Sequence, residues 1–459
     1  MRQSALLKDE PERPCVVVVG GGFSGLAACR RLRKKFNVVL VDAKEYFEYY
    51  PGILRAYLHP AEHGKLCAMY QQVCDGMDCR FVWAEVTSIN PIERSVAVKC
   101  MAQESEQTVD YDYCIVTSGS QYGLYMSSGK YASAAAECLW YPTFLDRARK
   151  TQSKWGSLDE RFLSGRRAHF EAELKVLKDL AKQKATIVII GAGFVGIEWA
   201  TEVKYYLPEI DVVVVESRAE CVSVMPPRCR QYCQRYMDKV GIRTFYNVDY
   251  KSVTSAPSEA DREQLDKLGV HKAARLYMAV GVRSINQFLP AECLDDMKYD
   301  PGTGDVTRGG FIVCNKSMQV LDKGAQPWGG GRVFAAGNCC NVQGMRLPKN
   351  SFPGEDMAKV CAYNIEVMSG AKSSKGGCFS FLRPKKLKEI HWTFGMGLCA
   401  TSLGPFDATF VAGGTEKPGS GYTVLTGVLS AYQKEFIRWS KVDETRMGFI
   451  GHAVWCMVH

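Results

Sequence analysis

Short runs of consecutive apolar residues recur along the chain, separated by stretches with the spacing of amphipathic helices. Four valines, Val16 to Val19, form the first run, which is typical of a strand buried on both faces of a parallel sheet. Comparable runs occupy residues 37–41, 111–116, 187–190, 212–215 and 333–336. Helical patterns occupy residues 26–36, 166–184, 354–365 and 428–439. This alternation predicts an α/β protein with parallel sheets.

The first apolar run leads directly into a glycine pattern. Gly20, Gly22 and Gly25 form G-x-G-x-x-G, and a helix, a second strand and Asp42 follow in that order. Such glycines permit a tight turn, the approach of a pyrophosphate and close helix–strand packing, while the acid accepts hydrogen bonds from an adenosine ribose. The helix N-terminus faces the phosphates. We expect a dinucleotide site here, which also includes Gly21, Phe23, Ser24 and Ala43.

The same arrangement is repeated in the middle of the chain. Gly191, Gly193 and Gly196 lie between a strand and a helix, and the next strand ends at Glu216. Two complete units predict two Rossmann-like dinucleotide-binding domains, and the second site also includes Phe194 and Val195. A carboxylate at Glu216 favours a ribose 2′-hydroxyl and repels a 2′-phosphate, which predicts NADH rather than NADPH.

Glu198 is the candidate catalytic residue. We place it in the first turn of the helix after the second glycine pattern. A carboxylate in that turn complements the helix dipole, which would explain its presence without any catalytic role. The alternative is that Glu198 faces the junction where two ring systems stack.

Several other strand ends carry small residues that let the backbone pass close to a ligand. Val86 lies on a strand that we expect beside the adenine. The strand before Gly337 is expected to return to the first sheet, so the second domain would be inserted in the first. The aromatic cluster at residues 46–50 is interpreted equally as sheet packing or as a wall beside a flat ring. The turns that we assign to the cofactor sites contain Thr117, Ser118 and Gly119, then Gly281, then Gly337 and Asn338.

Length and composition set the domain plan. A chain of 459 residues predicts two or three domains, and no run is long and apolar enough to span a bilayer. We expect the first domain at 14–150 and 311–384, a crossover at 151–185, the second domain at 186–310 and a β-rich interface domain at 385–459. The net charge of +9 is scattered, which suits contact with an anionic membrane surface or an acidic partner; nucleic acid is not an expected partner.

The cysteine spacing decides between a thiol, disulfide and metal interpretation. Nineteen cysteines are present, but no C-x-x-C pairs occur, and most cysteines lie in apolar runs where they behave as small hydrophobic residues. The pattern therefore predicts a reducing compartment and no metal site.

Together these motifs resemble the two-dinucleotide-binding-domain flavoproteins, in particular the type II NADH dehydrogenases and the apoptosis-inducing-factor-like quinone reductases. The resemblance covers nearly the whole chain and rests on both glycine patterns, EYFEYYPGILRA, TSG at 117–119, GAGFVGIE, AVGVRSIN and VFAAGN. ATSLGPFDA and SAYQKEFIRWSK look most like the second branch. The resemblance implies FAD in the first domain, NADH in the second, and Glu198 near the flavin.

The implied activity is hydride transfer from NADH to FAD, followed by transfer of electrons to a quinone or a similar small acceptor. We also expect association with the mitochondrial inner membrane or the cytoplasmic membrane surface, and a homodimer is a further expectation. An alternative is a structural FAD-binding subunit of a larger, respiratory-type complex. That alternative is motivated by Asn338, where the family usually has Asp, and by SFPGEDMAKVCAYNI, which lacks the A-Q-x-x-x-Q pattern of the quinone-contacting helix.

Two related activities depend on cysteines. A disulfide reductase of this fold needs C-x-x-x-x-C soon after the first glycine pattern, and residues 43–66 contain no cysteine. A sulfide:quinone reductase needs distant cysteines that meet at the flavin. Cys138, Cys339, Cys340 and Cys361 keep that alternative open.

Overall fold

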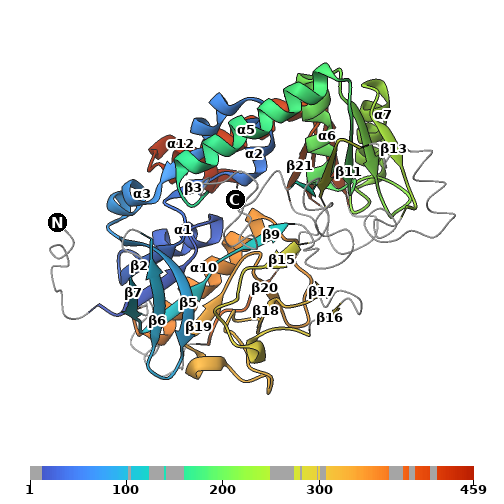
Figure 1. Cartoon of the computed structure of the whole chain (residues 1–459). Helices are drawn as coiled ribbons and strands as arrows, with labels where there is room; N and C mark the ends of the chain where they lie inside the picture. The colour runs from blue at the N-terminus through green and yellow to red at the C-terminus, as the bar shows by residue number, and fades with distance from the viewer. Residues whose placement is uncertain are drawn as a thin grey trace.

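Two sheets with parallel strands stand side by side, and a long helix, α5 (Leu163–Lys182), runs along one edge of the molecule (Figure 1). This computed structural model describes residues 13–101, 105–122, 139–140, 160–248, 273–279, 282–296, 298–299, 306–371, 386–391, 398–413 and 421–458.

The first sheet has seven strands in the order β19-β8-β1-β2-β5-β6-β7. Its central strands are parallel because each is a short apolar run that other elements cover on both faces, and the valines of β1 are almost completely buried. The last three strands form an antiparallel meander. The strand bounds are β1 Cys15–Val19, β2 Asn37–Asp42, β5 Arg80–Asn90, β6 Ser95–Cys100, β7 Glu106–Asp110, β8 Tyr113–Val116 and β19 Val333–Ala335.

Helices α1 (Phe23–Leu32) and α10 (Ser351–Met368) pack against each other beside this sheet. Both begin three residues earlier than their apolar patterns predict, because each added stretch contains one phenylalanine among serine, glycine or proline and so lacks an apolar repeat. The aromatic stretch continues into η1 (Tyr50–Gly52), α2 (Ile53–Leu58) and η2 (Pro60–Leu66), followed by α3 (Tyr70–Met77). Strand β3 (Tyr46–Glu48) pairs antiparallel with β4 (Cys67–Met69).

The second sheet is parallel and has the order β10-β14-β11-β12-β13. Its strand β11 and helix α6 hold the second glycine pattern between them. Strand β10 lies within the residues expected for the first domain, yet it pairs with β14 here; the domain boundaries themselves stay a prediction. The elements are β10 Leu139–Trp140, β11 Thr186–Ile190, α6 Phe194–Tyr206, β12 Asp211–Val215, α7 Pro227–Lys239, β13 Arg243–Phe245 and β14 Arg275–Met278.

The stretch after β14 differs from its prediction. We expected a turn around Arg283, but residues Val282–Ser284 form strand β15, which pairs antiparallel with β9 (Ser120–Tyr122). The chain leaves the second sheet there, and the Ser284 hydroxyl donates to the Cys339 carbonyl at 2.8 Å. This contact holds β15 beside the first sheet's turns, which the local sequence does not reveal. Gly281 lies outside the described residues.

The C-terminal segment adds an antiparallel sheet, β21-β22-β23, and two helices that pack on each other. Helix α11 (Val428–Thr445) extends two turns beyond its predicted end at Trp439, because Val442 and Thr445 are buried and prolong its packed face. The remaining bounds are β16 Lys298–Tyr299, β17 Val306–Arg308, β18 Ile312–Cys314, β20 Cys340–Val342, β21 Cys399–Ser402, β22 Ala408–Gly413, β23 Tyr422–Thr426, α12 Phe449–Val458, η4 Ala291–Cys293 and η5 Trp328–Gly331.

Candidate functional site

A cavity of about 710 Å³ lies where the two sheets and the C-terminal segment meet. Both glycine patterns open onto it, and C-terminal residues close it from a third side. The predicted site residues that line it are Gly20, Gly22, Phe23, Ser24, Asp42, Ala43, Val86, Thr117, Ser118, Gly119, Gly193, Phe194, Val195, Glu198, Gly337 and Asn338.

The first glycine pattern forms a tight strand-to-helix turn. The Gly20 N–H donates to the Val41 carbonyl at 2.8 Å, and Gly20 has φ +100°, which favours glycine. A Cβ on Gly25 would lie 1.9 Å from the Gly20 oxygen, so only glycine permits this helix–strand packing. The Thr117 hydroxyl donates to the same carbonyl oxygen at 2.7 Å and joins the turn after β8 to it.

Asp42 connects the end of β2 to this turn. Its Oδ2 accepts from the Gly21 N–H at 2.7 Å, and its Oδ1 accepts from the Lys44 N–H at 2.8 Å. Gly21 itself faces the Tyr70 ring, which a Cβ would meet at 2.5 Å. The carboxylate therefore orders the backbone of the glycine turn in addition to facing the cavity.

The second glycine pattern repeats this geometry closely. The Gly191 N–H donates to the Val215 carbonyl at 2.7 Å, and a Cβ on Gly196 would lie 1.8 Å from the Gly191 oxygen. Glu216 takes the place of Asp42: its Oε2 accepts from the Ala192 N–H at 2.8 Å and its Oε1 accepts from the Arg218 N–H at 3.0 Å. Two units far apart in sequence thus build the same strand, turn, helix and acid.

The middle glycine of each pattern leaves room for a ligand. A Cβ on Gly22 or on Gly193 would meet nothing within 4 Å. Each is the N-cap residue of its helix, and neither helix start has a side-chain cap or an acidic residue in its first turn. Free N–H groups and a positive dipole end therefore face open space at both turns, as an anionic pyrophosphate requires.

Glu198 lies at the cavity but not where we predicted it within its helix. It belongs to the second turn of α6, so complementing the helix dipole does not explain it. Its Oε1 accepts from the Lys434 ammonium at 2.5 Å and from the Ser402 N–H at 2.9 Å. The Lys434 ammonium also contacts the Ser402 hydroxyl at 2.7 Å. The mostly buried carboxylate is thus held by two C-terminal elements, β21 and α11.

Some residues of the aromatic cluster at 46–50 line the cavity, and others pack within the fold. Phe47, Tyr49 and Tyr50 line the cavity, and the Tyr50 hydroxyl accepts from the Lys44 ammonium at 2.6 Å. Tyr46 is fully buried elsewhere and donates to the Glu160 carbonyl at 2.8 Å. The cluster therefore both packs the fold and forms a cavity wall.

Some predicted site residues do not line the cavity. Gly25 and Gly196 lie at helix–strand contacts, where their role is in packing. Glu216 orders the second turn from outside the cavity wall. Gly281 falls among residues that the structure leaves undescribed. The remaining predicted residues away from the wall are Gly21 and Gly191.

Sequence reasoning missed the cavity residues of the C-terminal segment. They come from β21, β22, α11 and α12, and lysine and aromatic residues in an amphipathic helix give no local sign of a ligand site. The motif SAYQKEF resembles a family segment but by itself indicates no role for its lysine. The missed residues of this segment are Leu398, Cys399, Ala400, Phe410, Lys434, Ile437 and Trp455, and the missed lysines outside it include Lys44 and Lys349.

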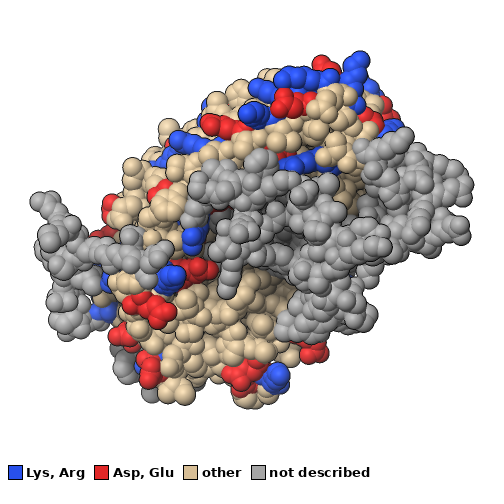
Figure 2. Space-filling model, viewed as in Figure 1, with Lys and Arg blue, Asp and Glu red and all other residues tan. Residues whose placement is uncertain are grey.

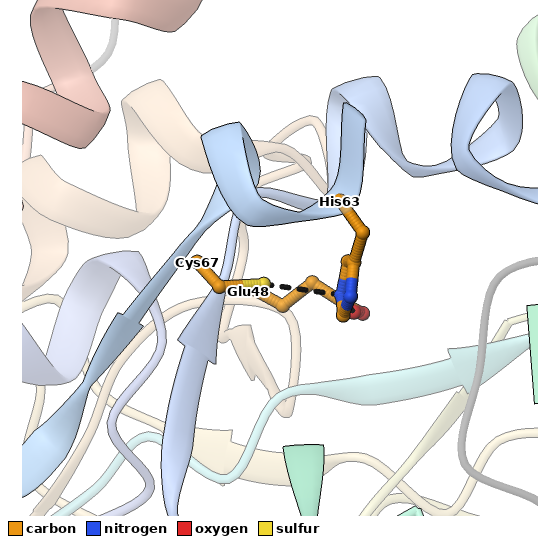
Figure 3. A group of neighbouring side chains, drawn as sticks. All are labelled: Glu48, His63 and Cys67. Atoms are coloured by element: carbon orange, nitrogen blue, oxygen red, sulfur yellow. Dashed lines mark hydrogen bonds and ion pairs between the residues drawn. The ribbon is translucent and has the colours of Figure 1, made fainter. Parts of the chain in front are cut away.

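A buried cluster joins Glu48, which also lines the cavity, to His63 and Cys67 (Figure 3). The His63 Nε2 lies 2.7 Å from Glu48 Oε1 and 3.1 Å from the Cys67 sulfur, within the reach of a metal ion. However, the Arg166 guanidinium donates to both Glu48 oxygens, at 3.2 and 3.3 Å, and already balances that charge. Burial and Glu48 raise the pKa of the Cys67 thiol, so its sulfur stays protonated. The arrangement is a charge-balanced core network.

The sequence matches the pyridine nucleotide-disulphide oxidoreductases over residues 14–354. The chain belongs to this family. Ferroptosis suppressor protein 1 of Xenopus tropicalis is 25% identical over 381 residues, covering 80% of this chain and 85% of that protein. A sulfide:quinone oxidoreductase from Aquifex aeolicus shares the fold with a TM-score of 0.67 at 14% identity, covering 95% and 92% of the two chains. NDH2 from Plasmodium falciparum, solved with NADH, gives 0.63 at 10% identity, covering 97% and 98%.

These matches confirm the predicted α/β flavoprotein fold and the resemblance on which the cofactor expectation rests. The family uses FAD together with NAD(P)H, and these are the cofactors of this chain. The turns at Gly22 and Gly193 leave open space beside the N-terminal ends of α1 and α6. The protein is therefore an FAD-dependent oxidoreductase of pyridine nucleotides.

Proposed function

We propose that the protein is an NADH dehydrogenase that passes a hydride from NADH to FAD and electrons on to a quinone. The observation that carries the proposal is the single cavity that both glycine turns and the C-terminal helices share. Hydride transfer needs the two cofactors in contact, and one continuous cavity with two phosphate-binding turns allows it.

The first turn is assigned to FAD and the second to the nicotinamide cofactor, following the order of the domains. Bound FAD supplies the capacity to accept a hydride and to release electrons. Around it, some of this chain's residues line the cavity to bind phosphate, ribose and ring, and others shape the two glycine turns from behind the cavity wall. For FAD these are Gly20, Gly21, Gly22, Phe23, Ser24, Gly25, Asp42, Ala43, Val86, Thr117, Ser118, Gly119, Gly337 and Asn338. For NADH they are Gly191, Gly193, Phe194, Val195, Gly196, Glu216 and Gly281.

Glu198 is the residue to which we assign proton handling. Its carboxylate sits on the cavity wall beside the second turn, and the Lys434 ammonium holds it in place. A carboxylate–ammonium pair can hold or release a proton at the position where a reduced acceptor needs one. Glu198 is buried enough to exclude bulk water from this exchange.

The C-terminal end of the cavity suits a hydrophobic acceptor. Phe410, Ile437 and Trp455 line it, and α11 carries an exposed apolar face just outside. That face contains Tyr432, Phe436 and Trp439, whose exposed fractions are 66%, 50% and 40%. None of the helices that the structure describes is long and apolar enough to cross a bilayer. We therefore propose peripheral attachment at a mitochondrial or cytoplasmic membrane surface, with α11 facing the lipid.

Anaerobic mixing with NADH tests this function. The purified yellow protein should lose its flavin absorbance on addition of NADH and regain it on addition of a short-chain ubiquinone analogue, with NADH preferred to NADPH. Flavin that NADH does not bleach would instead support a structural FAD-binding subunit. Bleaching without reoxidation by quinone would retain the dehydrogenase and reject the acceptor.

The structural-subunit alternative keeps one observation in its favour. Asn338 lines the cavity directly after β19, and an amide there retains one acceptor oxygen but lacks a carboxylate's charge. The change weakens a contact to FAD without filling the cavity. The intact Glu198–Lys434 pair favours turnover over a purely structural role.

The geometry does not favour a sulfide:quinone reductase. Cys339, Cys340 and Cys361 are fully buried behind the turn at Gly337 and do not line the cavity, and Cys138 lies outside the described residues. Hydrogen bonds with neighbouring thiols, together with burial, raise the pKa of both Cys339 and Cys340, which keeps them protonated. Cys399 does line the cavity, but sulfide oxidation by this fold requires cysteines that meet.

A further inference from the structure

A second, much smaller cavity of about 30 Å³ adjoins the first. Glu198 and Lys434 line both cavities, so this pair forms the wall between them. The small cavity continues away from the main one between α2, α6 and α11, where charged side chains line it. Its volume is enough for about one or two water molecules.

Glu202 is a buried carboxylate that lines this small cavity. It lies one helical turn after Glu198 on α6, and only 2% of its surface is exposed. Its Oε1 accepts from the Arg55 guanidinium at 2.8 and 3.1 Å. Its Oε2 is buried and has no partner among the residues that the structure describes. A lone buried carboxylate oxygen is costly, and a water in the adjoining cavity would satisfy it.

The outer part of the cavity leads toward solvent through more exposed charges. Arg55 also donates to Glu435 Oε1 at 3.1 Å, and the Arg438 guanidinium donates to Glu435 Oε2 at 2.6 Å. Glu435 and Glu62, which both line the cavity, are exposed by 39% and 29%. Titratable groups therefore continue from the surface to Glu202 and on to Glu198.

We propose that Glu202 and this water-sized cavity form the route that supplies protons from solvent to Glu198. The proposal rests on the proposed function, because it concerns protons taken up by a quinone. In the balanced reaction, NADH, one proton and a quinone give NAD⁺ and a quinol. NADH contributes two electrons and one proton as a hydride, so one proton per turnover has to come from solvent.

The environment of Glu202 suits this role. Burial raises the pKa of Glu202 above the ordinary value for a glutamic acid, and the nearby Glu198 raises it further. Arg55 and Lys434 oppose this shift without cancelling it. The other charged or titratable groups nearby are Glu435 and Arg438 on α11, Glu62 on η2, Tyr206 on α6 and Tyr236 on α7. A raised pKa brings proton uptake and release closer to neutral pH.

Two acceptors with different proton requirements test the route. Ferricyanide takes one electron and no proton, whereas a short-chain ubiquinone analogue takes protons. Glu202→Gln should lower kcat with quinone on the order of tenfold and leave the ferricyanide rate unchanged. Glu202→Asp keeps a titratable group and should recover part of the quinone rate. Glu366→Gln, which alters a buried carboxylate paired with Lys35 away from the cavity, is the matched control.

An infrared titration gives a readout that does not depend on turnover. The protonated Glu202 carboxyl should contribute a C=O stretching band that titrates above the ordinary pKa of glutamic acid, disappears in Glu202→Gln and persists in Glu366→Gln. The proposal would be overturned if Glu202→Gln lowered the quinone and ferricyanide rates equally, or lowered neither. The absence of the infrared band would also overturn it. If wild-type flavin is not bleached by NADH, the proposed function fails instead, and the infrared band still tests Glu202.

Discussion

Glycines of one motif have different tasks at the residue scale. Gly25 is needed because a Cβ there would lie 1.9 Å from the Gly20 carbonyl oxygen, whereas a Cβ on Gly22 would meet nothing within 4 Å. Gly25 is therefore needed for helix–strand packing, whereas Gly22 leaves space for a ligand. Gly196 and Gly193 show the same division in the second site.

This division predicts opposite results for two substitutions. Gly22→Ala should fold normally and lose most of its FAD, because the added methyl group occupies space proposed for the pyrophosphate. Gly25→Ala should lose more than about 4 kcal/mol of folding free energy, because its Cβ would collide with backbone. Thermal unfolding and flavin absorbance measure the two effects. Gly193→Ala is the matched control: it should retain FAD and bind NADH weakly. Normal FAD content in Gly22→Ala would contradict the assignment.

At the scale of elements, buried charges join segments that the hydrophobic pattern treats separately. One buried network joins Glu48 on β3 to His63 on η2 and Arg166 on α5. Burial alone would raise the pKa of Glu48, but Arg166, His63 and Lys44 lower it to about 2. Helix α5 is thus attached to the first domain's aromatic segment by a charge pair as well as by apolar packing.

The network makes stability depend on acid. Because the pKa of Glu48 is lower in the folded protein than the ordinary 4.5, its contribution is complete above that value. It is lost as the pH falls from about 4.5 to about 2, and the loss is on the order of 3 kcal/mol. Urea unfolding at several pH values should show this slope in wild type and not in Glu48→Gln. Glu93→Gln, at an exposed turn, should retain the wild-type slope.

On the scale of the whole molecule, charge and apolar surface are distributed differently. Lys and Arg gather most clearly along the edge occupied by α5, while both signs are scattered elsewhere on the face in Figure 2. The exposed side chains of α11 instead form an apolar stripe, because Val428, Tyr432, Phe436 and Trp439 recur at helical spacing. The helix carries cavity residues on its other side, so membrane contact and acceptor entry would meet there.

A charge placed in this stripe tests the membrane proposal. Phe436→Asp should weaken binding to anionic lipid vesicles at least about tenfold, because one buried aromatic side chain contributes roughly 2 kcal/mol. Ferricyanide reduction should remain normal. Ile92→Asp, a change at an exposed residue of the first domain, should bind vesicles like wild type. Unchanged vesicle sedimentation of Phe436→Asp would remove α11 from the proposed membrane surface.

Much of the local fold follows from the sequence alone. Apolar runs predict the buried parallel strands, because both of their faces need cover, and the spacing of the glycines predicts each tight turn. Helix starts are less certain, since glycine and polar first turns lack the periodic apolar signal. Glu198 was predicted in the first turn of its helix, but it lies in the second turn because α6 begins at Phe194.

By itself, the sequence determined the two strand–turn–helix–acid units, because their hydrogen bonds and steric limits are local. Only the tertiary structure decided that Lys434 and Ser402 hold Glu198. It also decided that the chain leaves the second sheet to form β15, and that Glu202 adjoins a water-sized cavity. Those contacts join residues far apart in the chain. Periodicity reports which face of an element is buried, whereas the identity of the neighbour depends on how all the elements pack.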